Sequence, residues 1–131
     1  MHRILIVDDN PTFRSMLKEI LVARFPSTTI EQEPDGTDLI SRIDVFHPDI
    51  VFMDIRLPGE NGLGLTRKIK VNHPEITVII LTGYDFPEYR HAATQSKADY
   101  FITKDSSTQD FLALVESILT QKQSDHQKRP S

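Results

Sequence analysis

Residues 4–11 read Ile4-Leu5-Ile6-Val7-Asp8-Asp9-Asn10-Pro11, and this stretch decides the fold. Its four apolar residues follow one another without alternation, which is typical of a strand buried on both faces of a parallel sheet. Asn10 is a favourable helix cap, and proline is favourable in the first helical turn. The stretch therefore predicts a buried strand that passes directly into a helix, with two acidic residues at the junction.

The same strand–helix unit recurs along the chain. Further strands are predicted by the apolar runs at 29–33, 50–53, 76–81 and 100–103, the first of them more polar and nearer a sheet edge. Each strand is followed by apolar residues at helical spacing, such as Phe13 and Leu17 after the first strand. Asp85 is expected to cap the helix that begins near Pro87. Five units in strict alternation predict an α/β fold with a parallel sheet between two helical layers.

The chain has 131 residues, which suits a single domain. We expect that domain to span residues 1–121, and we expect the polar residues 122–131 to be a disordered tail or the start of a linker. The absence of cysteine excludes disulfides, and the net charge of −4 argues against direct nucleic-acid binding by this domain. No apolar run is long enough for a signal peptide or a membrane span, so we expect a cytoplasmic protein without a membrane segment.

Polar residues with complementary chemistry follow four of the predicted strands. They are Asp8 and Asp9 after the first strand, Asp54 after the third, Thr82 and Gly83 after the fourth, and Lys104 after the fifth. Ligands of an open parallel sheet bind beyond the carboxyl ends of its strands, so these residues are expected to share one crevice. Three carboxylates so close together repel one another, and a divalent cation relieves the repulsion. Oxygen ligands of this kind suit Mg²⁺.

The same residues suit phosphoryl transfer, which needs a nucleophile, a metal ion and donors around the phosphoryl oxygens. Asp54 is the candidate nucleophile, and Lys104 supplies a positive charge. The Thr82 hydroxyl and the backbone N–H of Gly83 supply donors. Taken singly, each residue is more often a feature of a turn or a helix cap than part of a site. Four strand ends that converge with complementary chemistry favour a functional site.

Five motifs give the sequence a resemblance to the receiver domain of bacterial two-component response regulators, over about residues 3 to 121. They are Ile4–Asp9, Met53–Gly59, Asn61-Gly62, Ile80–Gly83 and Phe101–Lys104. The resemblance implies a flavodoxin-like, doubly wound sheet of five parallel strands in the order 2-1-3-4-5, with five helices. It also implies a phosphorylation-dependent switch rather than an enzyme, whose own chemistry is limited to self-catalysed phosphoryl transfer and autodephosphorylation.

The resemblance implies a role for each residue that matches the family motifs. Asp54 is implied as the acceptor of a phosphoryl group from a sensor histidine kinase or a phosphotransfer protein. Mg²⁺, or Mn²⁺ in its place, is implied to bind Asp9, Asp54, the backbone carbonyl of Arg56 and, through water, Asp8. Lys104 is implied to pair with the phosphoryl group.

Further positions concern the switch and the lifetime of the phosphate. Thr82 matches the switch hydroxyl, and Phe101 lies where the family carries its aromatic switch residue. Arg56 lies two residues after Asp54, and Tyr84 lies two residues after Thr82. The resemblance implies that the residues at these two positions influence the rate at which the aspartyl phosphate hydrolyses. Both side chains are large, so we expect them to hinder the attacking water and to lengthen the phosphorylated state.

The sequence departs from the family pattern around the fifth strand. Asp105 follows Lys104 where the family often has proline, and we expect a trans bond, because a cis bond to a residue other than proline costs about 2.5–4 kcal/mol. Residues 104–106 resemble receivers attached to LuxR-type helix-turn-helix domains. A DNA-binding output domain in a longer chain is therefore an output to consider. A phosphorylation-dependent homodimer is a second one. Phe101 lacks the hydroxyl of the tyrosine that is frequent at its position.

Three other functions are weighed against this one. An inert receiver-like docking module is disfavoured by the intact set of acids. A haloacid-dehalogenase-type phosphohydrolase would use Asp8 as its nucleophile, but Asn10 stands where its general acid is required. A flavodoxin is disfavoured because its phosphate loop, rich in Ser, Thr and Gly, is replaced by acids. Phosphoryl transfer to Asp54 is the preferred function.

Overall fold

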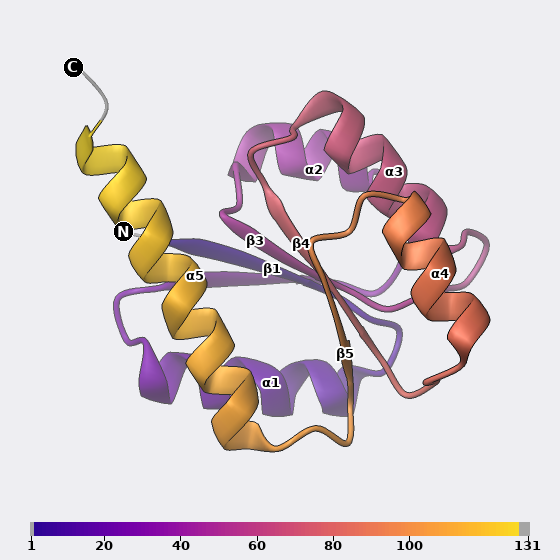
Figure 1. Ribbon diagram of the computed structural model, residues 1–131, viewed down its shortest axis with the longest axis horizontal. Coiled ribbons are helices and arrows are strands. Elements are labelled where there is room, and N and C mark those ends of the chain that lie inside the picture. The colour runs from indigo at the N-terminus through magenta and orange to yellow at the C-terminus, as the bar shows by residue number, and fades with distance from the viewer. Residues whose placement is uncertain (1, 129–131) are drawn as a thin grey trace.

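The computed structural model describes the backbone of residues 2–128 and the side chains of residues 2–124. Strands and helices alternate strictly along this part of the chain (Figure 1). The strands are β1 (Arg3–Val7), β2 (Thr29–Glu33), β3 (Ile50–Met53), β4 (Thr77–Thr82) and β5 (Tyr100–Thr103). The helices are α1 (Pro11–Arg24), α2 (Leu39–Phe46), α3 (Gly62–Asn72), α4 (Pro87–Gln95) and α5 (Thr108–Lys128). The prediction of five strand–helix units is confirmed.

The strands form one parallel sheet in the order β2-β1-β3-β4-β5. This is the strand order that the resemblance implies. The polar strand β2 lies at one edge, as its composition predicts, and β5 lies at the other. The apolar strands β1, β3 and β4 lie in the middle, where both faces of the sheet are covered.

A hydrophobic cluster packs on each face of the sheet. Helices α1 and α5 cover one face, and their buried residues include Leu17 and Val115 (Figure 1). Helices α2, α3 and α4 cover the other face, and their buried residues include Ile43, Ile69 and Ala93. This double covering explains why β3 is buried along its whole length. It also leaves the carboxyl ends of the strands as the accessible edge at which polar residues can gather.

The helix starts agree with the sequence at α1 and differ at α4. The Asn10 side chain caps α1 by accepting a hydrogen bond from the Phe13 N–H at 3.1 Å. At α4 the cap position is Phe86, which makes no side-chain cap hydrogen bond, so the prediction that Asp85 caps this helix is wrong. The Asp85 carboxylate instead accepts from Arg90 Nε at 2.5 Å. The long arginine reaches back along the first turn and takes the carboxylate.

Helix α5 is longer than the sequence predicts. Residues 122–128 are helical, although a disordered tail or a linker was expected from residue 122. No glycine or proline interrupts residues 108–128, and glutamine and lysine are good helix formers. The Lys122 ammonium also donates to the Glu75 carbonyl at 2.9 Å, which attaches the helix to the body of the domain. Residues 129–131 lie outside the described residues, and the domain boundary at 121 stays a prediction.

Two further expectations concern the peptide bond after Lys104 and membrane-spanning helices. Between residues 2 and 128 no peptide bond is cis, so the bond between Lys104 and Asp105 is trans, as expected. None of the helices in that range combines the length and the apolar composition that crossing a bilayer requires.

Candidate functional site

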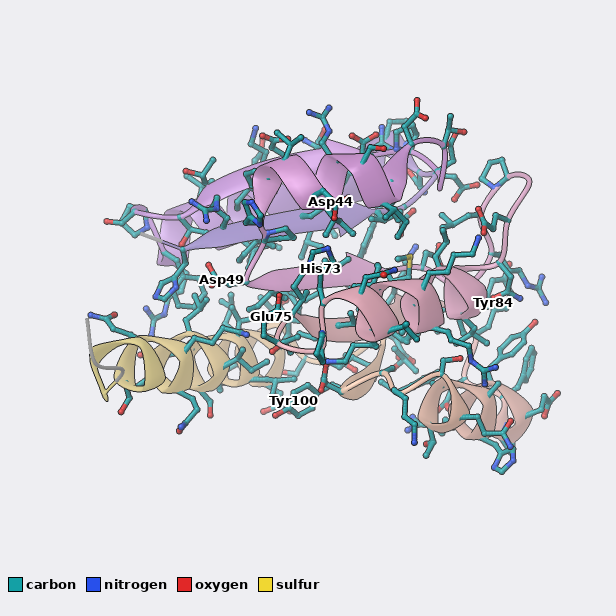
Figure 2. All side chains as sticks on the ribbon, turned by 90° about the horizontal axis from the view of Figure 1, so that it is seen from above. Asp44, Asp49, His73, Glu75, Tyr84 and Tyr100 are labelled. Atoms are coloured by element: carbon teal, nitrogen blue, oxygen red, sulfur yellow. The ribbon has the colours of Figure 1, made fainter. Side chains whose placement is uncertain are left out.

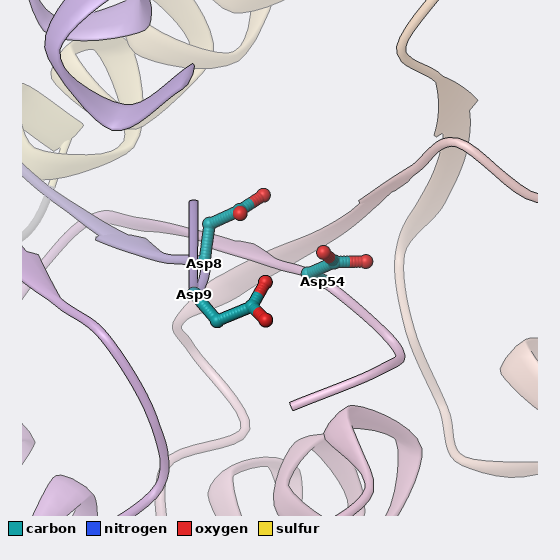
Figure 3. Close-up of side chains that lie close together, drawn as sticks. All are labelled: Asp8, Asp9 and Asp54. Carbon is teal, nitrogen blue, oxygen red and sulfur yellow. The ribbon is translucent and has the colours of Figure 1, made fainter. Parts of the chain in front are cut away.

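Three acids meet at the carboxyl ends of two neighbouring strands (Figure 3). β1 pairs with β3 so that Val7 lies beside Met53, and the residues that follow them leave the sheet together. One carboxylate oxygen from each of Asp8, Asp9 and Asp54 lies within 4.8 Å of the others. The Asp54 N–H donates to the Val7 carbonyl at 3.0 Å and keeps the two strand ends in register. The structure thus brings together the three acids on which the sequence argument depends.

The three acids differ in burial. The exposed fractions of Asp8 and Asp54 are 2% and 6%, whereas Asp9 faces solvent. Burial raises the pKa of Asp54, and the charge of Asp8 raises it further, while Lys104 acts in the opposite direction. The net direction is upward, so the Asp54 carboxylate is harder to ionise than that of a free aspartate.

Lys104 lies over the two buried acids. Its Nζ is 2.7 Å from Asp8 Oδ2 and 3.4 Å from Asp54 Oδ2. Burial lowers the pKa of Lys104, but the hydrogen bond to Asp8 and the charges of Asp54 and Asp8 outweigh it and leave the pKa above its usual value. The ammonium also lies 4.2 Å from the centroid of the Phe13 ring. Sequence reasoning placed Phe13 only on the core-facing stripe of its helix and missed this contact.

The acid cluster fits a magnesium ion. Carboxylates are hard oxygen ligands, and the exposed side of Asp9 leaves room for the waters that Mg²⁺ retains. Asp8 already uses both of its oxygens, since Oδ1 accepts from the Asn10 N–H at 2.9 Å and Oδ2 faces Lys104. Lys104 lies closer to Asp8 than to Asp54, and this close pairing suits a contribution of Asp8 to metal binding through water.

The ends of β4 and β5 add the remaining predicted residues. Thr82 is fully buried at the end of β4, and its Oγ1 accepts from the Tyr84 N–H at 3.3 Å. The Lys104 N–H donates to the Thr82 carbonyl at 2.8 Å, which ties the two strand ends together. Gly83 is exposed, and a Cβ added to it would meet no atom within 4 Å. The backbone after Thr82 is therefore accessible to a ligand.

Phe101 lies on β5 below α4. Its ring is half-buried and packs against the hydrophobic cluster that α2, α3 and α4 cover. The guanidinium carbon of Arg90 lies 4.6 Å from the ring centroid. Arg90 therefore covers the ring that the resemblance assigns to the switch.

Arg56 and Tyr84 are in direct contact. The Arg56 guanidinium carbon lies 3.8 Å from the centroid of the Tyr84 ring, and the same guanidinium donates to the Tyr89 hydroxyl from Nη2 at 3.0 Å and from Nε at 3.3 Å. In Figure 2 Tyr84 lies well away from the labelled His73 and Asp49. Sequence reasoning missed Tyr89, because Tyr89 lies within α4 and does not follow the end of a strand.

Comparison with known proteins agrees with this arrangement. A family model described as the response regulator receiver domain matches residues 4–116. The transcriptional regulatory protein TrcR of Mycobacterium tuberculosis is 30% identical over 129 residues, which are 98% of this chain and 49% of that protein. The DNA-binding transcriptional regulator NtrC of Salmonella typhimurium is 32% identical over 127 residues, which are 96% of this chain and 26% of that protein. The chain thus spans half or less of these relatives.

A solved structure extends the agreement to three dimensions. The crystal structure of a CheY-like response regulator receiver domain protein from Methanospirillum hungatei superimposes with a TM-score of 0.85 and 26% sequence identity. The superposition covers 95% of this chain and 98% of that one. Since the family model spans most of the chain and the sheet has the strand order of these proteins, the chain belongs to the response regulator receiver domains, the signalling modules of two-component systems.

Proposed function

We propose that this domain accepts a phosphoryl group on Asp54 from the phosphohistidine of a sensor histidine kinase or a phosphotransfer protein, in a Mg²⁺-dependent reaction. One observation carries the proposal: Asp8 and Asp9 after β1 and Asp54 after β3 meet under the ammonium of Lys104, which follows β5. A carboxylate nucleophile that works with a divalent cation needs this combination of acids and a positive charge.

In the proposed transfer, an oxygen of the ionised Asp54 carboxylate forms a bond to phosphorus while the phosphorus–nitrogen bond of the donor breaks. The electron pair of that bond stays on the imidazole nitrogen. Asp9, Asp54 and the backbone carbonyl of Arg56 would hold Mg²⁺ or Mn²⁺, with Asp8 acting through water, and the bound ion neutralises charge on the phosphoryl oxygens. Lys104 Nζ lies 3.4 Å from Asp54 Oδ2, close enough to contact a phosphoryl oxygen carried there.

The transferred group would then recruit donors from β4. We assign this role to the Thr82 hydroxyl and the Gly83 N–H. The Thr82 Oγ1 accepts a hydrogen bond of 3.3 Å from the Tyr84 N–H, which is long and therefore weak enough to exchange. Movement of Thr82 opens space for Phe101, which would separate from Arg90. The surface of α4, β5 and α5 changes shape through this shift in population between two packings.

The changed surface is proposed to act on an output outside this chain, in the cytoplasm. The names of TrcR and NtrC describe transcriptional regulators, and this chain spans only part of each. These relatives support a DNA-binding output domain in a longer chain. A homodimer that forms on phosphorylation is the alternative output.

Labelling with a small-molecule phosphodonor such as acetyl phosphate tests the proposal. The wild-type protein should be labelled only when Mg²⁺ is present, and Asp54→Asn should not be labelled. Asp38→Asn is a matched control, because Asp38 is an exposed acid at the start of α2 that makes no cap hydrogen bond. Labelling of Asp54→Asn at the wild-type level would mean that another residue accepts the phosphoryl group.

The contact between Arg56 and Tyr84 bears on how long the phosphate lasts. Arg56 and Tyr84 follow the ends of the neighbouring strands β3 and β4, and we expect the stacked pair to hinder the water that attacks phosphorus. Arg56→Ala and Tyr84→Ala should therefore each raise the rate at which labelled protein loses phosphate once the donor is removed. Loss of phosphate at the wild-type rate in both variants would show that the pair does not set the lifetime.

A further inference from the structure

Two tyrosines hold the Arg56 side chain. Its Nη2 and Nε donate to the Tyr89 hydroxyl at 3.0 and 3.3 Å, and its guanidinium carbon lies 3.8 Å from the centroid of the Tyr84 ring. We call Arg56, Tyr84 and Tyr89 the Arg56 clamp. The clamp joins three segments: the loop after β3, the loop after β4, and the first turn of α4.

Tyr89 is the anchored member of the clamp. Its ring is half-buried and packs against the hydrophobic cluster beneath α4, whereas 39% of Tyr84 is exposed and Arg56 faces solvent. The Phe86 ring supports both tyrosines, with centroids 5.5 Å from Tyr89 and 6.2 Å from Tyr84. An exposed arginine has many rotamers, and ordering it costs entropy. The hydrogen bonds to an anchored hydroxyl select the rotamer that stacks on Tyr84.

The clamp lies beside the phosphoryl acceptor. Arg56 is two residues after Asp54, Tyr84 is two residues after Thr82, and the two strands that end there are neighbours in the sheet. The stacked pair therefore bridges the strand ends between which the phosphoryl group would lie. We propose that Tyr89 is a positioning residue that holds Arg56 over Tyr84 and thereby slows hydrolysis of the aspartyl phosphate. This inference rests on the proposed function, because it concerns the phosphate that Asp54 would carry.

The step that the clamp slows is the attack of water on phosphorus. The water oxygen forms a bond to phosphorus while the bond between phosphorus and the Asp54 oxygen breaks. The carboxylate leaves with the electron pair of that bond, and both protons of the water stay on the released dihydrogen phosphate. The attacking water needs an open path to phosphorus on the side opposite the Asp54 oxygen. A guanidinium fixed on Tyr84 narrows the approach more than a freely rotating one.

Tyr89→Phe tests the inference, because it removes the hydroxyl and keeps the ring. The variant is labelled with acetyl phosphate and Mg²⁺, the donor is removed, and phosphate release is followed. The expected result is hydrolysis about twofold to tenfold faster than wild type, the order expected when the two hydrogen bonds that share the Tyr89 hydroxyl are lost. The initial rate of labelling and the midpoint of thermal unfolding should stay at wild-type values. Tyr100→Phe is the control that removes another tyrosine hydroxyl, since Tyr100 is exposed and lies well apart from Tyr84 (Figure 2).

A double-mutant cycle shows whether Tyr89 acts through Arg56. In an Arg56→Ala background, Tyr89→Phe should cause no further acceleration. Two results would overturn the role assigned to Tyr89. One is that Tyr89→Phe loses its phosphate at the wild-type rate. The other is that Tyr89→Phe accelerates hydrolysis equally in the wild-type and Arg56→Ala backgrounds. A change in labelling and unfolding together with hydrolysis would also overturn it, because a general structural defect moves all three. Failure of the proposed function looks different, since wild-type protein would then take up no label on Asp54.

Discussion

At the scale of single residues, Asp54 shows a conflict between stability and function. Its carboxylate is buried beside Asp8, and both features raise its pKa. The same carboxylate must be ionised to attack phosphorus. Lys104 reduces the conflict by pairing with both acids, but one ammonium faces three carboxylates. The raised pKa of Asp54 therefore lowers the stability of the metal-free domain at neutral pH, whereas the raised pKa of Lys104 acts in the opposite direction.

Asp54→Asn should stabilise the metal-free protein near neutral pH. The pKa of Asp54 is higher in the folded state than in the unfolded state. Between these two pKa values the folded state binds more protons than the unfolded state. The free energy of unfolding therefore falls as the pH rises through this interval. Removing the charge should raise the unfolding midpoint in the presence of a chelator, and in a domain of this size each 1 kcal/mol of stabilisation corresponds to roughly 2–6 °C. The difference should shrink near pH 4, where Asp54 is increasingly protonated in both states.

Thermal unfolding at the two pH values checks this, with Glu19→Gln as a control that removes one negative charge from the exposed face of α1. A lower midpoint for Asp54→Asn than for wild type at neutral pH would contradict the direction assigned to the Asp54 pKa.

Lys104→Met should slow phosphorylation without abolishing the fold. The ammonium lies near both buried acids, where it can contact a phosphoryl oxygen. Loss of one such electrostatic contact typically slows a reaction by about 10²-fold, and a partly solvated site should lose at least about tenfold. The initial rate of labelling by acetyl phosphate measures the effect. Lys18→Met, which removes an exposed charge from α1, should label at the wild-type rate.

At the scale of elements, the start of α3 depends on a close backbone approach. The Gly62 N–H donates to the Ile55 carbonyl at 2.8 Å, and a Cβ on Gly62 would lie 1.8 Å from the carbonyl oxygen of Asp54. No side chain fits there unless the helix or the acceptor strand moves. Asn61 caps the helix by accepting from the Leu63 N–H at 2.7 Å, so the cap and the glycine together fix the segment after Asp54.

Gly62→Ala should lower the free energy of unfolding by at least about 2 kcal/mol, because backbone atoms cannot yield as a flexible side chain can. Gly64→Ala is the control on the same helix, where an added Cβ meets no atom within 4 Å. It should leave stability unchanged or raise it by about 0.5–1 kcal/mol through higher helix propensity. Urea denaturation compares the two, and equal stabilities would show that the approach at Gly62 is not constrained.

The elements could be predicted where their residues decide them locally. Periodicity placed the strands and helices, and Asn10 at the start of α1 has its cap partner only three residues away. The prediction failed at two helix ends. Asp85 lies one residue before the cap position of α4, and its carboxylate accepts from Arg90 within the same segment, a local pairing that competes with capping. Helix α5 extends beyond residue 121, where Lys122 makes a tertiary contact with the Glu75 carbonyl that leaves no periodic signal in the sequence.

At the scale of the whole molecule, the parallel sheet assembles the site. Residues that are far apart in sequence meet because the carboxyl ends of the strands lie on one edge. The strand-end rule therefore predicted the meeting of Asp8, Asp9 and Asp54 with Lys104. It could not predict Tyr89, because Tyr89 reaches the site from within a helix, through the direction of its side chain.

Mg²⁺ should stabilise the folded domain, since only the folded state brings the three acids together. At a concentration about ten times the dissociation constant, the gain is about 1.4 kcal/mol, or a rise of several degrees in the unfolding midpoint. Asp9→Asn should reduce this shift to near zero while leaving the buried pair in place. Glu19→Gln should keep it, and an equal Mg²⁺ shift in Asp9→Asn would place the ion elsewhere.

The central claim is that Asp54 accepts a phosphoryl group, and chemical trapping of the acyl phosphate tests it most directly. The protein is incubated with acetyl phosphate, with and without Mg²⁺, then treated with borohydride, which reduces an aspartyl phosphate to homoserine. Peptide mass spectrometry then locates the modified residue. We predict homoserine at position 54, only in the sample that contained Mg²⁺. Homoserine or phosphate at another position, or no modification with Mg²⁺ present, would contradict the account.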